Sequence, residues 1–339
     1  MEKGILNIKN LKTSFRIQDD YYAAVDNVSL TLNKNEVLAI VGESGCGKSA
    51  LAFSIMGLHK QARIEGEILY NNANLVNLPN NKMNELRGDS LGMIFQDPMS
   101  ALNPLMIIGD QIEEVLYLHN KSMSKKEQAK KALYLLEKVG ITNPKRTYHQ
   151  FPHELSGGMR QRVIIAIAIA NEPEILIADE PTTALDATIQ SQILDLMVEL
   201  KEEMEAGIIL ITHDLGVVAE MADRVAVMYA GQIVEITDVY TLFKEPLHPY
   251  TRSLLNSIPT NVEPKSKLHV IQGIVPTLQN LPRTGCRFSH RIAWIGDDCH
   301  EKDPELHEVS PGHFVRCTCY KHFDFENSKE DEQLESRSK

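Results

Sequence analysis

GESGCGKS, at residues 42–49, is the stretch of this chain that decides its fold. It follows five apolar residues, VLAIV at 37–41, which predict a buried strand. The glycines of the stretch allow a tight backbone path whose N–H groups turn inward and form a nest for an anion. A helix is expected from Lys48 onward, and its positive N-terminal end faces the same anion. This order of strand, glycine-rich loop and helix predicts a nucleotide-binding α/β domain.

The individual residues of the loop have separate expected roles. Lys48 is placed to reach the β- and γ-phosphates, and the Ser49 hydroxyl to bind Mg²⁺. We interpret Cys46 as filler at a position free to vary, and not as a nucleophile. The expected nucleotide-binding residues of this loop are Gly42, Glu43, Ser44, Gly45, Cys46, Gly47, Lys48 and Ser49.

A second apolar strand carries two acidic residues at its end. EILIA at 174–178 is followed directly by Asp179 and Glu180. Ligands of parallel-sheet proteins lie at the carboxyl ends of the strands. We therefore expect Asp179 to hold Mg²⁺ and Glu180 to orient or polarise the attacking water, which predicts hydrolysis. The alternative is a pair of carboxylates that only caps a strand.

Three further motifs follow in a fixed order: FQDP at 95–98, LSGGM at 155–159 and THD at 212–214. Together with the two motifs above, they resemble the nucleotide-binding subunit of an ABC transporter over residues 5 to about 258. The resemblance implies an α/β fold, an ABC-type P-loop nucleotide-binding domain with a RecA-like core, an antiparallel β subdomain and a helical subdomain. It also implies ATP and Mg²⁺ as cofactors, and a site that closes only when two such domains enclose ATP.

The resemblance assigns further positions. Gln96 matches the Q-loop glutamine beside Mg²⁺, Asp186 matches the D-loop, and His213 matches the switch histidine that contacts the γ-phosphate. The signature turn, which contacts the ATP of the opposite subunit, matches Ser156, Gly157 and Gly158. Phe15 lies where the family places an aromatic ring against adenine. Phe15 as a core residue, or Tyr21 or Tyr22 in the stacking role, remain alternatives.

The order of patterns along the chain predicts its organisation. Short alternating strands at 5–40 indicate an antiparallel sheet, and a helical pattern fills 107–139, with Ser124 and Glu127 as a capping box. We expect an ABC domain at 1–245 with its helical subdomain at about 97–165, and a small C-terminal extension at 246–324. The charged end, 325–339, is expected to be a disordered tail.

The segment PLHPYTRSLLNSIP at 246–259 indicates which branch of the family the chain resembles. Its HPYT resembles the start of the C-terminal extension of oligopeptide, dipeptide and nickel importer ATPases, and Met159 resembles the D-type subunit. This implies an ATPase that powers peptide uptake; a nickel or metal-chelate importer, or a non-transport ABC ATPase, is the alternative. The implied partners are a second, F-type ABC ATPase, two transmembrane permeases and an extracytoplasmic substrate-binding protein.

Four of the five cysteines lie between residues 286 and 319. The family extension often reads GCxFxxRC followed by two more cysteines and can bind an iron–sulfur cluster. GCRFSHRI at 285–292 places Ile292 where the second cysteine is expected. The remaining candidates for a [4Fe-4S] cluster or zinc are Cys286, Cys299, Cys317 and Cys319, with free thiols as the alternative.

Composition limits the other possibilities. The formal net charge of −11 argues against general binding of nucleic acid, which needs a basic face. No apolar stretch reaches the roughly 18 residues that span a bilayer, and Met1–Leu11 lack a secretory pattern. We therefore expect a peripheral protein on the cytoplasmic side of the cell membrane, held there by its permeases.

Overall fold

The computed structural model describes residues 4–183, 185–257, 271 and 273–324. The predicted disordered tail at 325–339 lies outside the described residues. Within the described part, no helix combines the length and the apolar character needed to cross a bilayer.

The main sheet has eight strands in the order β11-β12-β10-β9-β3-β8-β7-β6. Five consecutive strands, from β9 to the edge strand β6, are parallel, and every residue of β3 is buried, as its unbroken apolar sequence predicts. Hairpins extend the sheet beyond β9. The bounds are β3 Val37–Val41, β6 Leu91–Ile94, β7 Ile175–Asp179, β8 Gly207–Thr212, β9 Arg224–Tyr229, β10 Gln232–Asp238, β11 Leu306–Ser310 and β12 His313–Arg316.

A second, antiparallel sheet has the order β2-β1-β4-β5. Its first two strands are the predicted alternating segments, which pair from Leu6 with Leu32 to Ile17 with Asp20. The bounds are β1 Leu6–Ile17, β2 Asp20–Leu32, β4 Ala62–Tyr70 and β5 Ala73–Asn74. One apolar core lies between this sheet and the main sheet and includes residues of both, such as Leu6, Ile8, Leu38 and Ile40.

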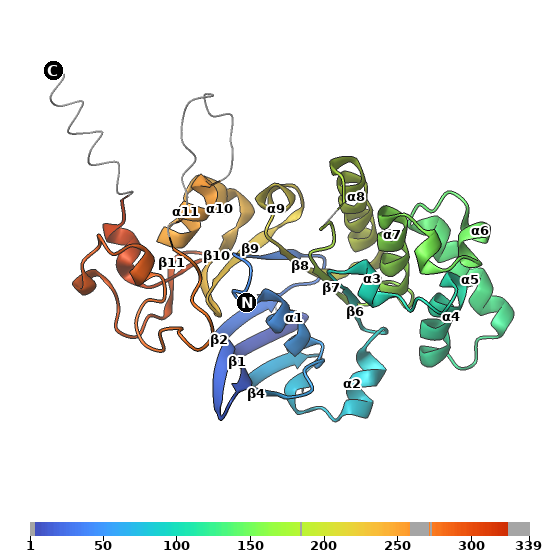
Figure 1. Ribbon diagram of the computed structural model, residues 1–339, viewed down its shortest axis with the longest axis horizontal. Helices are drawn as coiled ribbons and strands as arrows, with labels where there is room; N and C mark the ends of the chain where they lie inside the picture. The colour runs from blue at the N-terminus through green and yellow to red at the C-terminus, as the bar shows by residue number, and fades with distance from the viewer. Residues whose placement is uncertain (1–3, 184, 258–270, 272, 325–339) are drawn as a thin grey trace, which may run out of the picture.

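Helices fill the interval between β6 and β7, and in Figure 1 α4, α5 and α6 gather at the end of the molecule opposite the extension. Ser124 and Glu127 form the predicted capping box at the start of α5. The α-helices of the described residues are α1 Lys48–Ile55, α2 Asn80–Leu86, α3 Pro98–Ala101, α4 Ile108–His119, α5 Lys125–Lys138, α6 Pro144–Tyr148, α7 Gly157–Ala168, α8 Ala187–Met204, α9 Leu215–Met221, α10 Val239–Lys244 and α11 Pro249–Asn256.

The C-terminal extension is continuous with the main sheet. β12 pairs with β10, so the last hairpin adds two strands to the edge of the nucleotide-binding core. The described part of the extension also contains the short 3₁₀ helices η3 Ser289–Arg291, η4 Asp297–Cys299 and η5 Thr318–His322. The predicted α/β fold, with its antiparallel sheet, helical insert and small extension, is therefore present, whereas the boundary at 245 and 246 stays a prediction.

Candidate nucleotide site

The phosphate loop joins the buried strand β3 to helix α1. Gly47 has a φ of 109°, and a Cβ there would lie 2.3 Å from the carbonyl oxygen of Ala24, so only glycine fits. Lys48 is 6% exposed, and its Nζ donates to the carbonyl oxygens of Gly42 at 2.7 Å and Glu43 at 3.1 Å. Burial raises the pKa of the Cys46 thiol, which fits the prediction that this residue is inert filler.

Asp179 ends strand β7 at the carboxyl edge of the sheet, as predicted. It is 2% exposed, and its Oδ1 has no hydrogen-bond partner among the described residues. Burial raises the pKa of this carboxyl, while hydrogen bonding with Ser49 acts in the opposite direction. A buried carboxylate oxygen without a partner is costly unless a cation binds it. Asp179 and Ser49 therefore fit the Mg²⁺ of a nucleotide complex.

The carboxylate of Glu180 contacts three side chains, one from its own loop and two from other segments. Its carboxylate accepts hydrogen bonds from Gln96 Nε2 at 3.0 Å and Thr183 Oγ1 at 2.8 Å, and it lies 3.1 Å from His213 Nδ1. Burial tends to raise the pKa of Glu180, but the bonds from Thr183 and His213 outweigh it and lower the pKa. An ionised carboxylate is the form that accepts a proton from water.

The backbone of Glu180 has a φ of 47°, which is the left-handed region. A non-glycine residue persists there only where its surroundings hold it, and such positions concentrate at functional sites. The sequence did not single out Thr183, although its place three residues after Glu180 is the available signal.

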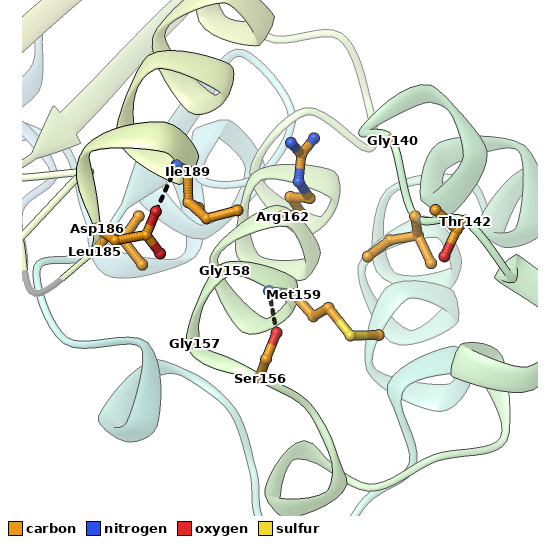
Figure 2. Close-up of a pocket in the computed structure, with 11 residues that line it drawn as sticks. Gly140, Thr142, Ser156, Gly157, Gly158, Met159, Arg162, Leu185, Asp186 and Ile189 are labelled. Carbon is orange, nitrogen blue, oxygen red and sulfur yellow. Dashed lines mark hydrogen bonds between the residues drawn. The ribbon is translucent and has the colours of Figure 1, made fainter.

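The signature turn and the D-loop face a different pocket, which has a volume of about 480 Å³ (Figure 2). Ser156 caps α7 by accepting from Met159 N, and Asp186 caps α8 by accepting from Ile189 N. Gly158 lies against α8, where a Cβ would come within 2.8 Å of Ile189. The residues that line the pocket are Gly140, Ile141, Thr142, Ser156, Gly157, Gly158, Met159, Arg162, Leu185, Asp186 and Ile189. Neither the phosphate loop nor Glu180 is among them.

Comparisons with known proteins identify the family of the chain. The family model "ABC transporter" matches residues 25–183, and "Oligopeptide/dipeptide transporter, C-terminal region" matches 234–299. The chain is 50% identical to the oligopeptide transport ATP-binding protein OppD of Lactococcus lactis subsp. cremoris, over 96% of this chain and 97% of that protein. It is 49% identical to the oligopeptide transport ATP-binding protein AppD of Bacillus subtilis, over 93% and 97%.

The chain belongs to the ATP-binding subunits of oligopeptide and dipeptide ABC transporters. It is an ABC transporter ATPase. Among solved structures, the dimeric cassette MJ0796 bound to ADP and phosphate is 31% identical, with a TM-score of 0.63 over 69% of this chain and 98% of that one. CbiO1 from Clostridium perfringens, part of the transporter complex cbiONQ, is 30% identical, with a TM-score of 0.61 over 72% and 92%.

The aromatic candidates of this ABC subunit lie on β1 and β2. Phe15 and Tyr22 are directly paired across the two strands. The ring of Phe15 meets His59 at 5.0 Å in an edge-to-face arrangement, whereas the guanidinium of Arg283 lies 5.2 Å from the Tyr22 ring. Tyr21 is 51% exposed. Phe15 as the adenine-stacking residue stays a prediction.

The extension of this ABC subunit contacts the phosphate loop directly, which the sequence did not predict. Glu43 N donates to the Tyr250 hydroxyl at 2.8 Å, and Arg291 Nη1 lies 2.6 Å from Glu43 Oε2. His248 caps α11 by accepting from Tyr250 N at 3.1 Å. In HPYT, the histidine thus sets the helix start and the tyrosine reaches the loop. Burial lowers the pKa of His248 to about 4.

The cysteines of the extension do not group as expected. Cys286, Cys317 and Cys319 come together, but the fourth member of the group is His300, and Cys299 lies outside it. Cys299 is half-buried and packs against the apolar core that the extension shares with β3, α9 and β9. Cys299 and His300 are neighbours at the end of η4, so their side chains leave the backbone in different directions. The predicted four-cysteine set is therefore corrected at one position.

Proposed function

We propose that this subunit hydrolyses ATP at a site that a second ABC ATPase completes, and so powers peptide uptake. The observation that carries the proposal is the separation of the two half-sites within one chain. Lys48, Asp179 and Glu180 serve one half, while the pocket at Ser156 and Asp186 lies elsewhere. In the dimer we propose, each pocket receives the γ-phosphate of the ATP that the opposite chain holds.

The roles of this chain's own residues follow from their chemistry. When bound, Mg²⁺ would be held by Ser49, Asp179 and Gln96, and it would neutralise charge on the phosphates. Glu180 takes a proton from the attacking water, because its carboxylate is kept ionised. His213 lies against Glu180, and its proposed role is to contact the γ-phosphate. Phe15 stacks on adenine, since Tyr22 is already covered by Arg283.

The loop after Gln96 is proposed to receive a cytoplasmic helix of a permease. Met99 is 55% exposed and Leu105 is 85% exposed, so apolar side chains stand on this surface. Gln111 holds the loop in shape through Asn103 N, Asn103 O and Met106 O. A cysteine at Leu105 should crosslink to the permease loops, whereas one at Tyr240, which is 68% exposed on α10, should not.

The full assembly we propose contains this D-type subunit, an F-type ATPase, two permeases and an extracytoplasmic binding protein. Its cargo is oligopeptides or dipeptides, and its place is the cytoplasmic face of the cell membrane. The two relatives described above are both named as oligopeptide transport proteins. Their names support a peptide cargo and not a nickel chelate. The chain has no proposed role with nucleic acid.

Assembly is tested by measuring ATP turnover of the purified chain alone, with the F-type subunit, and with the permeases added. We expect little turnover alone and a large gain in the complex. A Ser156→Arg variant should block the site of the partner while leaving ATP binding at its own Lys48 intact. Full turnover from a strictly monomeric preparation, independent of concentration, would contradict the proposal.

A further inference from the structure

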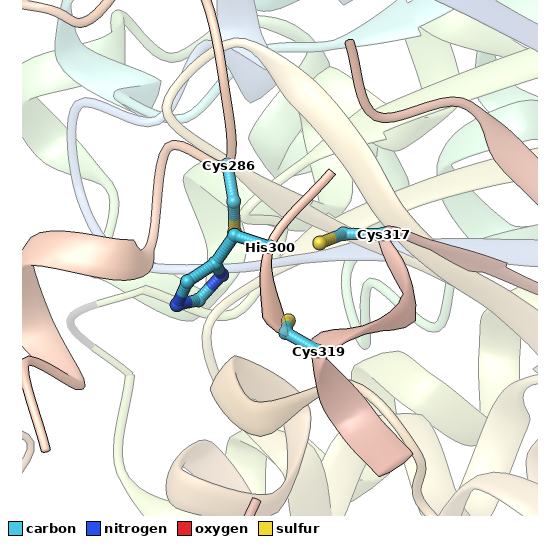
Figure 3. Close-up of side chains that lie close together, drawn as sticks. All are labelled: Cys286, His300, Cys317 and Cys319. Atoms are coloured by element: carbon cyan, nitrogen blue, oxygen red, sulfur yellow. The ribbon is translucent and has the colours of Figure 1, made fainter. Parts of the chain in front are cut away.

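Three cysteines and one histidine converge in the C-terminal extension (Figure 3). Their ligand atoms, three Sγ and one ring nitrogen, all lie within 4.8 Å of one another. The four residues come from three segments: the loop before η3, the end of η4, and the turn from β12 into η5. We call them the Cys3His cluster: Cys286, His300, Cys317 and Cys319.

The histidine of the cluster lacks the hydrogen bonds that a buried imidazole needs. Both ring nitrogens of His300 are shielded from solvent, and neither has a partner among the described residues. A buried polar atom left without a partner destabilises the folded chain. A metal ion is the partner that the three neighbouring sulfurs would share with one of these nitrogens.

The spacing of the ligand atoms fits one ion and not a cluster of irons. Around a tetrahedral zinc, with bonds of about 2.0–2.3 Å, neighbouring ligand atoms stand roughly 3.5–3.8 Å apart. In a [4Fe-4S] cluster each thiolate binds a different iron, so the sulfurs stand farther from one another. The four ligand atoms here lie within 4.8 Å of one another, so they need to move together only slightly to bind a single ion. They are too close together to hold four irons between them.

The residues expected to complete an iron–sulfur cluster are elsewhere. Ile292, at the position of the second family cysteine, is 1% exposed and packs in the apolar core that the extension shares with β3, α9 and β9. Cys299, which the family pattern provides as a ligand, lies outside the group. Cys3His is among the common ligand sets of structural zinc.

The surroundings supply a positive charge. Three thiolates, one neutral imidazole and one Zn²⁺ carry a net charge of −1. Arg316, next to Cys317, is 5% exposed, donates to the carbonyl oxygens of Ile233 and Pro304, and forms no ion pair in the described part of the chain. It lines the same small cavity as Cys286 and Cys317. An anionic metal centre would balance this buried guanidinium.

We propose that the Cys3His cluster binds a single zinc ion that fastens the three segments of the extension together. The zinc stands in place of the iron–sulfur cluster that the family pattern implies. Because Cys286 is followed directly by Arg287, which pairs with Asp26 of β2, the ion also holds the extension against the nucleotide-binding core. This proposal goes beyond peptide uptake and does not depend on it.

Metal content tests the proposal without any measurement of ATPase activity. The full chain is purified without chelators and without a histidine tag, and its zinc, iron and acid-labile sulfide are measured. We expect about one zinc per chain and no stoichiometric iron or sulfide. The His300→Ala and Cys317→Ser variants should each retain at most about one tenth of the zinc that the unaltered chain binds, because each substitution removes a ligand.

Two matched variants separate ligand loss from misfolding. Cys299→Ser should keep full zinc, since Cys299 lies outside the cluster, and His300→Cys should restore zinc through a four-cysteine set. Co²⁺ added to the metal-free full chain should give the absorption bands of a tetrahedral thiolate site. Stoichiometric iron with sulfide would overturn the proposal. So would zinc that depends on Cys299 but not on His300, or a folded chain that binds neither Zn²⁺ nor Co²⁺.

Discussion

In the ion pair between Glu43 of the phosphate loop and Arg291 of the extension, the arginine side chain is much more buried than the glutamate side chain. The side chain of Arg291 is 1% exposed and that of Glu43 is 29% exposed. The guanidinium also donates to the carbonyl oxygens of Ile271 and Gly273, at 3.3 and 3.2 Å. We predict that Glu43→Gln destabilises the protein more than Arg291→Met does.

The magnitude follows from burial. Removing one partner of a buried ion pair costs about 3–5 kcal/mol. In Glu43→Gln the new side-chain amide and the two carbonyls still solvate the guanidinium, so we expect the lower end, near 3 kcal/mol. In Arg291→Met the carboxylate that remains is partly exposed and rehydrates, so the cost is about 1 kcal/mol. The difference of about 2 kcal/mol corresponds to roughly 3 °C in Tm for a chain of this size.

One tryptophan makes the assay selective. Trp294 is the single tryptophan of the chain, lies in the extension three residues after Arg291, and donates to the carbonyl oxygen of Asp324. Its fluorescence reports unfolding of the extension, while far-ultraviolet circular dichroism reports the whole chain. Urea unfolding of both single variants and the double variant gives the coupling energy of the pair. A larger cost for Arg291→Met, or a coupling below about 0.5 kcal/mol, would refute the reasoning.

Three further predictions concern chemistry, pH and nucleotide affinity. Glu180→Gln should lower ATP turnover of the assembled complex by about 10²–10⁴ and leave nucleotide binding within a few-fold, since an amide cannot take the proton of water; undiminished turnover contradicts it. In the folded chain the pKa of His248 is about 4, well below its ordinary value near 6.5. As the pH drops from about 6.5 to 4, the unfolded chain therefore binds a proton at this histidine before the folded chain does. The free energy of unfolding should fall by up to about 3 kcal/mol over that range. His248→Asn, which keeps an acceptor for Tyr250 N, should flatten that fall in urea unfolding. Phe15→Ala should weaken ATP binding by about 0.5–1.5 kcal/mol, and Tyr22→Ala should change it little, as measured by titration calorimetry.

Residues that follow parallel strands were predictable because one rule locates them. The carboxyl ends of β3 and β7 meet at one edge of the sheet, so the phosphate loop and Asp179 had to lie near each other. The capping box of α5 was readable for a similar reason, since it depends on residues three apart. Local spacing and strand ends therefore account for most of the nucleotide half-site.

Contacts between distant segments were not predictable in the same way. The pair of Glu43 with Arg291 joins residues 248 positions apart, and neither belongs to a periodic pattern. The choice of His300 over Cys299 depends on which way two adjacent side chains leave a 3₁₀ turn, and counting cysteines does not reveal it. The family pattern favoured cysteine, and only the folded backbone separates the two.

The extension is best understood as part of the nucleotide site and not as an appendage. Tyr250 accepts a hydrogen bond from the backbone of Glu43, and Arg291 binds the side chain of the same residue. The first contact belongs to the HPYT segment and the second to the segment that carries Cys286, so two separate parts of the extension meet one residue of the phosphate loop. A loop residue held from both sides has fewer conformations to lose, so ATP binding costs less conformational entropy. Loss of the proposed zinc should therefore weaken ATP binding through Arg291, and it should weaken it no further in a chain that already carries Arg291→Met.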